Sequence, residues 1–188
     1  EEMLKARVSP DIDIIIQFDR RAPFLWEQDN KENWTTKRIK IENGEQRVLE
    51  DIGETNTGDP KVLGNFLRWG FEKYPSEKKI VIIWGHGGGG NEINSSMTRW
   101  VAEDDTSQDY LNNIEIKEAI SSLNQKINIL AFDACLMSVF ELMFELKDFA
   151  EYAIASQQIE PSDGWPYSDT LDFISKNSSL PINQQCEK

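Results

Sequence analysis

Cysteine and histidine are scarce in this sequence of 188 residues, which holds two cysteines and one histidine. Cys135 and Cys186 do not form a CxxC pair, and two distant cysteines with one histidine are a poor set of zinc ligands. A single possible pair also makes a disulfide framework unexpected. His86 is therefore the only imidazole that the chain can use, and no metal site is expected from these residues.

Long hydrophobic runs and basic residues are also lacking. No apolar stretch approaches the roughly 18 residues of a membrane helix, so no transmembrane segment is expected. The first ten residues contain no apolar core of a signal peptide, although a leader that had been removed would leave the same sequence. The net charge of −13 and the pI near 4.5 argue against nucleic acid and anionic membranes as partners. Basic or neutral partners stay open, and an acidic surface can also serve solubility alone.

The pattern that is present is that of one α/β domain over residues 1–188. Apolar residues make up 39% of the chain, which suits a globular core. Short runs rich in β-branched residues predict buried strands, and the middle two are nearly continuous, as in a parallel sheet. A further run alternates charged and apolar residues and predicts an edge strand. The buried runs are Ile12–Phe18, Ile80–Trp84, Ile127–Phe132 and Tyr152–Ser156, and the edge run is Arg38–Glu42.

Helical patterns lie between these runs. Asp59 followed by Pro60 predicts a helix start, because aspartate caps a first turn and proline tolerates its first position. Asn113 predicts the cap of a second helix over residues 114–123. The stretch 136–149 is apolar on most sides and predicts a well-buried helix. The alternation of strands and helices predicts an α/β sheet with right-handed crossovers, in which ligands bind outside the carboxyl ends of the strands.

The sole histidine and one cysteine follow two of these strands. His86 comes two residues after the run that ends at Trp84, and Cys135 follows the run that ends at Phe132, where the next helix is expected to begin. Consecutive β-α-β units place their strands side by side, so both residues are expected at the same edge of the sheet. The arrangement would bring a thiol and an imidazole together.

A thiol beside an imidazole favours a cysteine hydrolase. A helix N-terminus stabilises the thiolate form of Cys135, and His86 can give a proton to the leaving group. Two plainer interpretations stay open. Cys135 can be an inert buried cysteine, and His86 a structural histidine in a turn.

The glycines after the histidine, in IVIIWGHGGGG, allow three interpretations. An esterase loop would need a G-x-S-x-G nucleophile elbow, which is absent, and a second histidine. A phosphate loop would need a following Lys-Ser/Thr, which is also absent. Bare backbone N–H groups are the third possibility, since the amides of Gly87 and Cys135 could bind an oxyanion.

Two aspartates are candidates for a specificity pocket. Asp133 comes two residues before Cys135 and could select a basic side chain by charge-assisted hydrogen bonds, or it could cap the next helix. Asp163, in EPSDGWPY, could be a second pocket carboxylate or a turn aspartate.

Three blocks of the sequence, VIIWGHGGGG, ILAFDACLMS and ASQQIEPSDGWPY, together resemble the clostripain family of cysteine peptidases. That family shares a clan with caspases, legumain, gingipains and separase. The match covers roughly residues 12–167 in the right order. It implies a caspase-like three-layer α/β sandwich with a mostly parallel central sheet flanked by helices, and an endopeptidase that cuts protein or peptide substrates after Arg or Lys.

The resemblance also implies roles for single residues. Cys135 becomes the nucleophile, His86 the general acid/base, and the amides of Gly87 and Cys135 the oxyanion hole. Asp133 falls in the S1 pocket, and Asp163 lies in the block where a second S1 acid is expected.

The remaining implications concern activation, calcium and location. Members are often activated by self-cleavage, for which Arg99, in SMTRWV, is the candidate. Some relatives use calcium, which the acidic run 103–105 could host, although a solvated acidic loop is the simpler explanation; no other cofactor is expected. The family is mostly secreted or attached to the surface of bacteria. The chain is shorter than many members, so it could be a truncated core, and a catalytically inactive module that binds basic peptides is the alternative function.

Overall fold

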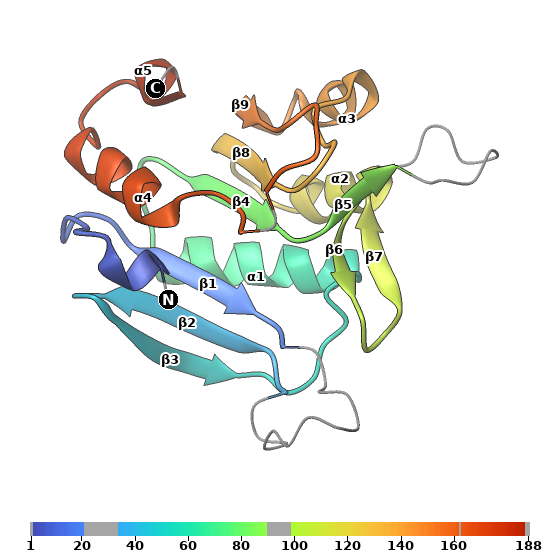
Figure 1. Ribbon diagram of the computed structural model, residues 1–188, viewed down its shortest axis with the longest axis horizontal. Coiled ribbons are helices and arrows are strands. Elements are labelled where there is room, and N and C mark those ends of the chain that lie inside the picture. Colours follow the sequence, from blue (N-terminus) through green and yellow to red (C-terminus); the bar gives the residue numbers. More distant parts are fainter. Residues whose placement is uncertain (1, 21–33, 90–98, 162, 187–188) are drawn as a thin grey trace. The chain divides into compact units, whose positions relative to one another are not determined.

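The computed structural model describes residues 2–20, 34–89, 99–161 and 163–186. Its backbone contacts divide the chain into two compact units. Unit 1 holds residues 1–55 with 165–188, and unit 2 holds residues 56–164. Each unit is described by itself, with the element labels of Figure 1. The single domain expected over residues 1–188 stays a prediction.

Unit 1 contains an antiparallel sheet that the sequence only partly predicted. Within the described residues its strand order is β1 (Ile14–Phe18), β2 (Lys37–Glu42), β3 (Glu45–Asp51). The first apolar run is thus a strand, and it pairs antiparallel with β2, whereas its pattern predicted a parallel sheet. The edge position expected for Arg38–Glu42 is wrong, because β2 lies between the other two strands.

The hairpin between β2 and β3 explains that error. Asn43 and Gly44 both have positive φ, at 55° and 76°, as a tight two-residue hairpin turn requires. The following strand, EQRVLED, carries few apolar residues, so it has no strong strand pattern of its own. The other elements of unit 1 are helical: η1 (Glu2–Lys5), α4 (Tyr167–Lys176) and α5 (Ile182–Cys186).

Unit 2 contains the predicted parallel sheet. Within the described residues its order is β4 (Ile80–Trp84), β8 (Ile127–Asp133), β9 (Ala150–Ile154), with both pairings parallel. β4 and β8 are neighbours, as expected. β8 is buried along most of its length, which is why its sequence is almost continuously apolar.

Two predicted helices of unit 2 begin at or beside the expected positions. α1 (Pro60–Lys73) is capped by Asp59, whose carboxylate accepts the Lys61 N–H at 2.8 Å. α2 (Asn113–Ser121) starts one residue earlier than expected, because Asn112 and not Asn113 is the cap. The side chain of Glu115 bonds back to the Asn112 N–H and completes a capping box. Leu67 of α1 and Ile116 and Ile120 of α2 pack into the core with the strands.

The third predicted helix, 136–149, is much shorter and more exposed than expected. α3 runs only from Phe140 to Leu146, and its Phe140 and Phe144 are 77% and 52% exposed. The residues before it pair elsewhere: the Leu136 N–H donates to Gln158 O at 3.1 Å, and the Ser138 N–H donates to Ser156 O at 2.8 Å. A backbone held in this way is not available for a helix turn.

A small antiparallel sheet in unit 2 was not predicted. Its order is β5 (Gly87–Gly89), β6 (Arg99–Asp104), β7 (Asp109–Asn112), within the described residues. The Trp100 indole covers the glycine strand closely, since a Cβ added to Gly88 would lie 2.6 Å from Trp100 Cζ2. A strand of bare glycines carries no apolar pattern, so sequence periodicity gave no sign of it.

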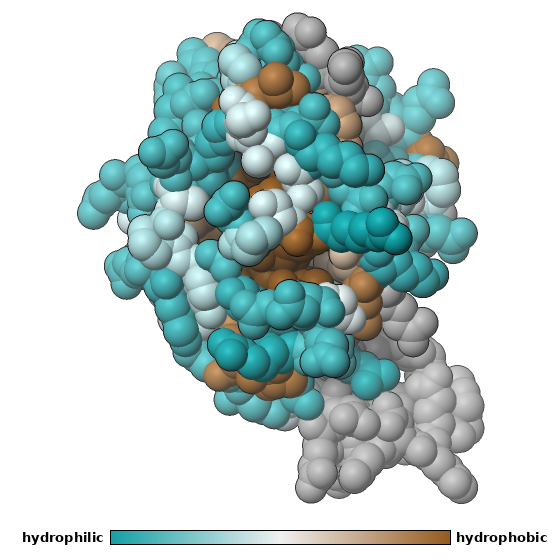
Figure 2. Space-filling view, turned by 90° about the vertical axis from the view of Figure 1, so that its left-hand side faces the viewer, coloured by the Kyte–Doolittle hydropathy of each residue, from teal (hydrophilic) through white to brown (hydrophobic). Residues whose placement is uncertain are grey.

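The surface is largely polar. Figure 2 shows hydrophilic side chains over most of one face, with hydrophobic ones in separate patches between them. This agrees with the acidic composition and the mean hydropathy of −0.54. In the part of the chain that the structure describes, every helix is too short or too polar to cross a bilayer.

Candidate active site

The two strands that precede His86 and Cys135 end side by side in unit 2. Trp84 of β4 pairs with Asp133 of β8, and the Gly85 N–H donates to Asp133 O at 3.3 Å. Both chains leave the sheet at its carboxyl edge directly after this contact. The structure therefore brings the segments that carry His86 and Cys135 to one edge, as the strand pattern predicted.

The glycine after the histidine lies against the backbone of Cys135. A Cβ added to Gly87 would be 2.4 Å from Cys135 O and 2.9 Å from Cys135 N, so any side chain at position 87 would collide with main-chain atoms. The Cα atoms of His86 and Gly87 are about 3.8 Å apart, as in any trans peptide. His86, which carries the imidazole, is thus the residue directly before the one whose backbone contacts Cys135. His86 is exposed and Cys135 is half-buried, so both are open to solvent.

The expected helix N-terminus at Cys135 is wrong. α3 begins at Phe140, and its cap residue, Val139, makes no side-chain cap bond. A helix dipole acts within about one turn, so α3 does not account for activation of the thiol. The sulfur has a different donor: the backbone N–H of Glu160 donates to Cys135 Sγ at 3.3 Å.

Asp133 is the last residue of β8 and is only 3% exposed. Its alternative role as a helix cap is excluded, because Val139 occupies the cap position of α3. The carboxylate instead faces Gly164 and Trp84. A Cβ added to Gly164 would lie 2.9 Å from Asp133 Oδ2 and 3.2 Å from Trp84 Nε1. Asp133 thus lies beneath a turn and beside an indole, two residues from the nucleophile candidate.

Asp163 lies in that turn. Its side chain is exposed, and the turn is closed by the Gly164 N–H, which donates to Pro161 O at 3.0 Å. The structure places Gly164, the neighbour of Asp163, against Asp133. Asp163 is thus a residue of a turn, and its role in a specificity pocket stays a prediction.

The candidate for self-cleavage is the first residue of a paired strand. Arg99 begins β6, and its backbone is in register with Gly89 of β5. The preceding Ser96–Thr98, which motivated the expectation of an exposed stretch, lies outside the described residues. Cleavage at this position stays a prediction.

The acidic run 103–105 is not simply a solvated loop. Glu103 and Asp105 are exposed, but Asp104 is 3% exposed. Its Oδ1 accepts the N–H groups of Thr106 and Ser107 at 2.9 and 2.8 Å, and its Oδ2 accepts the Thr57 N–H at 2.8 Å and the Thr57 hydroxyl at 3.3 Å. These four bonds fill the acceptor sites of one carboxylate. They tie the β6–β7 turn to the loop before α1, and calcium binding by the run 103–105 stays a prediction.

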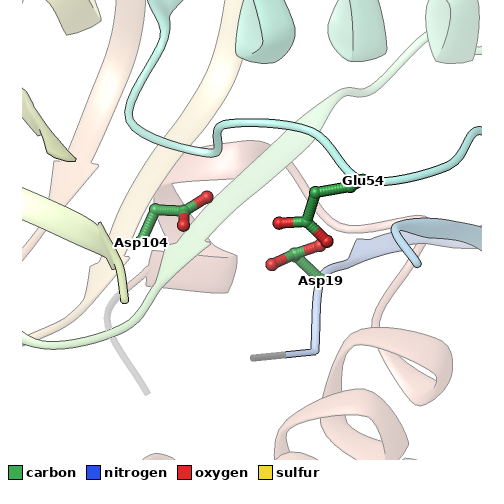
Figure 3. Close-up of side chains that lie close together, drawn as sticks. All are labelled: Asp19, Glu54 and Asp104. Carbon is green, nitrogen blue, oxygen red and sulfur yellow. The ribbon is translucent and has the colours of Figure 1, made fainter. Parts of the chain in front are cut away.

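Other acids gather in unit 1. Asp19 and Glu54 have carboxylate oxygens within 4.8 Å of each other, and Figure 3 shows the two side chains pointing toward one another. Asp19 also accepts the Thr36 hydroxyl at 2.5 Å. A pair of acids alone does not define a metal site, since exposed acidic groups commonly lie together without an ion.

Three residues near Cys135 were not singled out from the sequence. Trp84 was counted as the end of a strand, although it is 58% exposed. Glu160 acts through its backbone, which no side-chain pattern reveals. Gly164, with φ of 70°, lay in the EPSDGW block, where a glycine after an aspartate signals a turn with positive φ.

The fold is that of a caspase-like α/β protein, and the segments that carry His86 and Cys135 meet at one edge of its parallel sheet. The chain belongs to the clostripain family, peptidase family C11, whose profile matches residues 1–184. Clostripain of Hathewaya histolytica is 28% identical over 193 residues, which cover 88% of this chain and 36% of that protein.

Solved C11 proteases share the fold. A secreted C11 cysteine protease from Bacteroides thetaiotaomicron, in complex with an irreversible peptide inhibitor, superposes with a TM-score of 0.76 at 24% identity, covering 99% of this chain and 50% of that one. An inactive zymogen C11 protease from Parabacteroides distasonis superposes with a TM-score of 0.58 at 23% identity, covering 75% and 40%. The caspase-like fold class is confirmed, and the chain spans about a third to a half of the length of these relatives.

Asp104 should be important for stability. Replacing it with Ala leaves the N–H groups of Thr57, Thr106 and Ser107 without their acceptor, and we expect the free energy of unfolding to fall by about 1–3 kcal/mol. The matched control is Asp105→Ala, an exposed neighbour, which should stay within about 0.5 kcal/mol of wild type. Urea unfolding followed by circular dichroism measures both, and equal midpoints would contradict the structural role.

Proposed function

We propose that this chain carries the catalytic site of a cysteine endopeptidase that cleaves after Arg or Lys. The supporting observation is the contact of Gly87 with the backbone of Cys135. Because His86 directly precedes Gly87, this contact brings the backbones of the histidine and the cysteine close together. Membership of the clostripain family supports the same reaction. We infer from these observations that Cys135 and His86 are the reacting side chains.

The proposed reaction uses only groups of this chain and water. The Cys135 thiolate attacks the scissile carbonyl carbon, and protonated His86 gives its proton to the leaving amine as the C–N bond breaks. Water then attacks the thioester, His86 takes a proton from that water, and the acid product leaves. No cofactor is needed. Calcium stimulation stays a prediction from family resemblance.

The oxyanion would be bound by main-chain donors. The Gly87 and Cys135 amides belong to the two backbones that touch, so both could reach one developing negative charge. A side chain at position 87 would occupy this space. We therefore assign the two amides to the oxyanion hole of the proposed enzyme.

The preference for a basic residue would come from Asp133. A carboxylate suits a basic side chain, because the opposite charges attract and form strong hydrogen bonds. Asp163 is proposed as a lesser contributor, since its side chain points to solvent at the rim of the same turn. The partners are then proteins or peptides with Arg or Lys before the cut.

The roles of the reacting pair can be tested with peptide reporters that end in Arg or Lys. Cys135→Ala and His86→Ala should each lower kcat/KM by about 10³-fold or more, because nucleophile and acid/base act as one unit. Cys186→Ala is the control for loss of a thiol and should keep wild-type activity. Equal activity of wild type and Cys135→Ala would end the peptidase proposal.

The role of Asp133 can be tested by charge. Asp133→Asn should lower kcat/KM for an Arg reporter by about 10–100-fold, the loss of a hydrogen bond between charged groups. For a citrulline reporter, a neutral analogue of the Arg reporter, the same substitution should lower kcat/KM only slightly. Asp163→Asn is compared in the same assay and should lower kcat/KM for the Arg reporter by only a few-fold. An unchanged ratio of Arg to citrulline cleavage in Asp133→Asn would remove this residue from the pocket.

The alternative is an inactive caspase-like module that binds basic peptides. The burial of Asp133 beneath the Gly164 turn favours it, because a covered carboxylate does not receive substrate in this conformation. Thiol alkylation at neutral pH separates the two functions. A catalytic Cys135 should react much faster than Cys186, and similar rates would favour the module.

Self-cleavage after Arg99 is a further part of the proposal. We expect stored active protein to yield fragments 1–99 and 100–188, which intact mass spectrometry would detect. Cys135→Ala should give neither fragment, and Arg99→Gln should block this cut alone. Fragments that begin only at other residues would exclude Arg99.

The location is proposed from relatives. The Bacteroides thetaiotaomicron protease is described as secreted, and we extend this to the present chain as a bacterial protein that is secreted or held at the cell surface.

A further inference from the structure

We propose that Glu160 positions the nucleophile through its backbone N–H, which donates to Cys135 Sγ at 3.3 Å. The inference rests on the proposed function, since it gives this N–H a role at the sulfur that would attack the substrate. The side chain of Glu160 has no part in the contact. Glu160 therefore acts as a positioning residue by virtue of where its main chain runs.

Two backbone hydrogen bonds fix the segment before this N–H to the loop that follows Cys135. The Ser138 N–H donates to Ser156 O at 2.8 Å, and the Leu136 N–H donates to Gln158 O at 3.1 Å. Two residues further along, Glu160 reaches the sulfur. The three bonds follow one another along the two segments, as in a short irregular ladder. The first two therefore hold the backbone in a position from which the Glu160 N–H points at Sγ.

Local chemistry holds the segment in shape. The Ser156 hydroxyl accepts the Gln158 N–H at 3.0 Å and donates to Gln158 O at 3.1 Å, which closes a tight turn before the contact. On the other side, Pro161 follows Glu160, and a residue before proline is confined to extended conformations. The backbone of Glu160 is therefore restrained from both directions.

The contact fixes the direction of the sulfur without a helix that begins at Cys135. A backbone N–H that donates to Sγ favours the cysteine rotamer that keeps these two atoms in contact. The half-buried cysteine, whose backbone lies against Gly87, the residue after His86, thus has a sulfur with a fixed direction.

Proline substitution tests the proposal, because only proline removes a backbone N–H. Glu160→Pro should slow the alkylation of Cys135 by iodoacetamide at pH 7 at least tenfold relative to Cys186 of the same molecule. Glu160→Ala keeps the N–H and should alkylate at close to the wild-type rate. The matched control is Ile159→Pro, which puts proline in the same loop at an exposed residue whose N–H, among the described contacts, donates no bond. Equal rates in Glu160→Pro and Ile159→Pro would overturn the proposal.

Hydrogen exchange gives a second measurement that does not depend on the folding of the proline variants. In Cys135→Ala the acceptor is lost, and the Glu160 amide should exchange at least tenfold faster than in wild type, with the Leu136 and Ser138 amides unchanged. Unchanged exchange at Glu160 would refute the contact. Both readouts use the thiol and not peptide hydrolysis. If reporters are not cleaved but alkylation behaves as expected, the peptidase proposal fails and the positioning role stands.

Discussion

The contact between the backbones of Gly87 and Cys135 is the constraint on which the candidate site depends. A Cβ at position 87 would lie 2.4 Å from a carbonyl oxygen, so only glycine allows the two segments to meet. Strand pairing just before these residues makes the contact possible, because Trp84 and Asp133 are paired at the ends of two neighbouring parallel strands. Strand pairing brings the chains to the same edge, and the absence of a side chain lets them approach to main-chain distance.

The close approach is supported by less regular structure around it. Leu136, directly after the cysteine, has φ of 60°, a left-handed conformation that costs a leucine about 1–2 kcal/mol. The Leu136 N–H donates to Gln158 O, and Glu160, two residues after Gln158, supplies the N–H that donates to the sulfur. Strain of this kind persists only where surrounding contacts determine the backbone. A regular helix beginning at Cys135 would have avoided the strain, but it would have turned these residues away from the 156–160 segment.

The sequence predicted those parts of the fold that arise from local patterns. Continuous apolar runs identified β4 and β8, and an aspartate before proline identified the start of α1. The resemblance to the clostripain family named the residues that follow those strands. What sequence reasoning missed depends on contacts distant along the chain: β3 is polar, β5 has no side chains, and the shortening of α3 follows from hydrogen bonds to residues about twenty positions later. Periodicity carries no information about such partners.

Asp104 shows how a residue can be misjudged for the same reason. Between two exposed acids it has the composition of a solvated loop, yet its carboxylate is buried and accepts bonds from two separate parts of unit 2. It fixes the end of β6, the strand that pairs with β5, and β5 begins at Gly87. The glycine strand has no side chains with which to hold itself in place, so its position depends on β6 and on the Trp100 indole that covers Gly88. Asp104 is thus part of the framework that keeps the histidine loop against the backbone of Cys135.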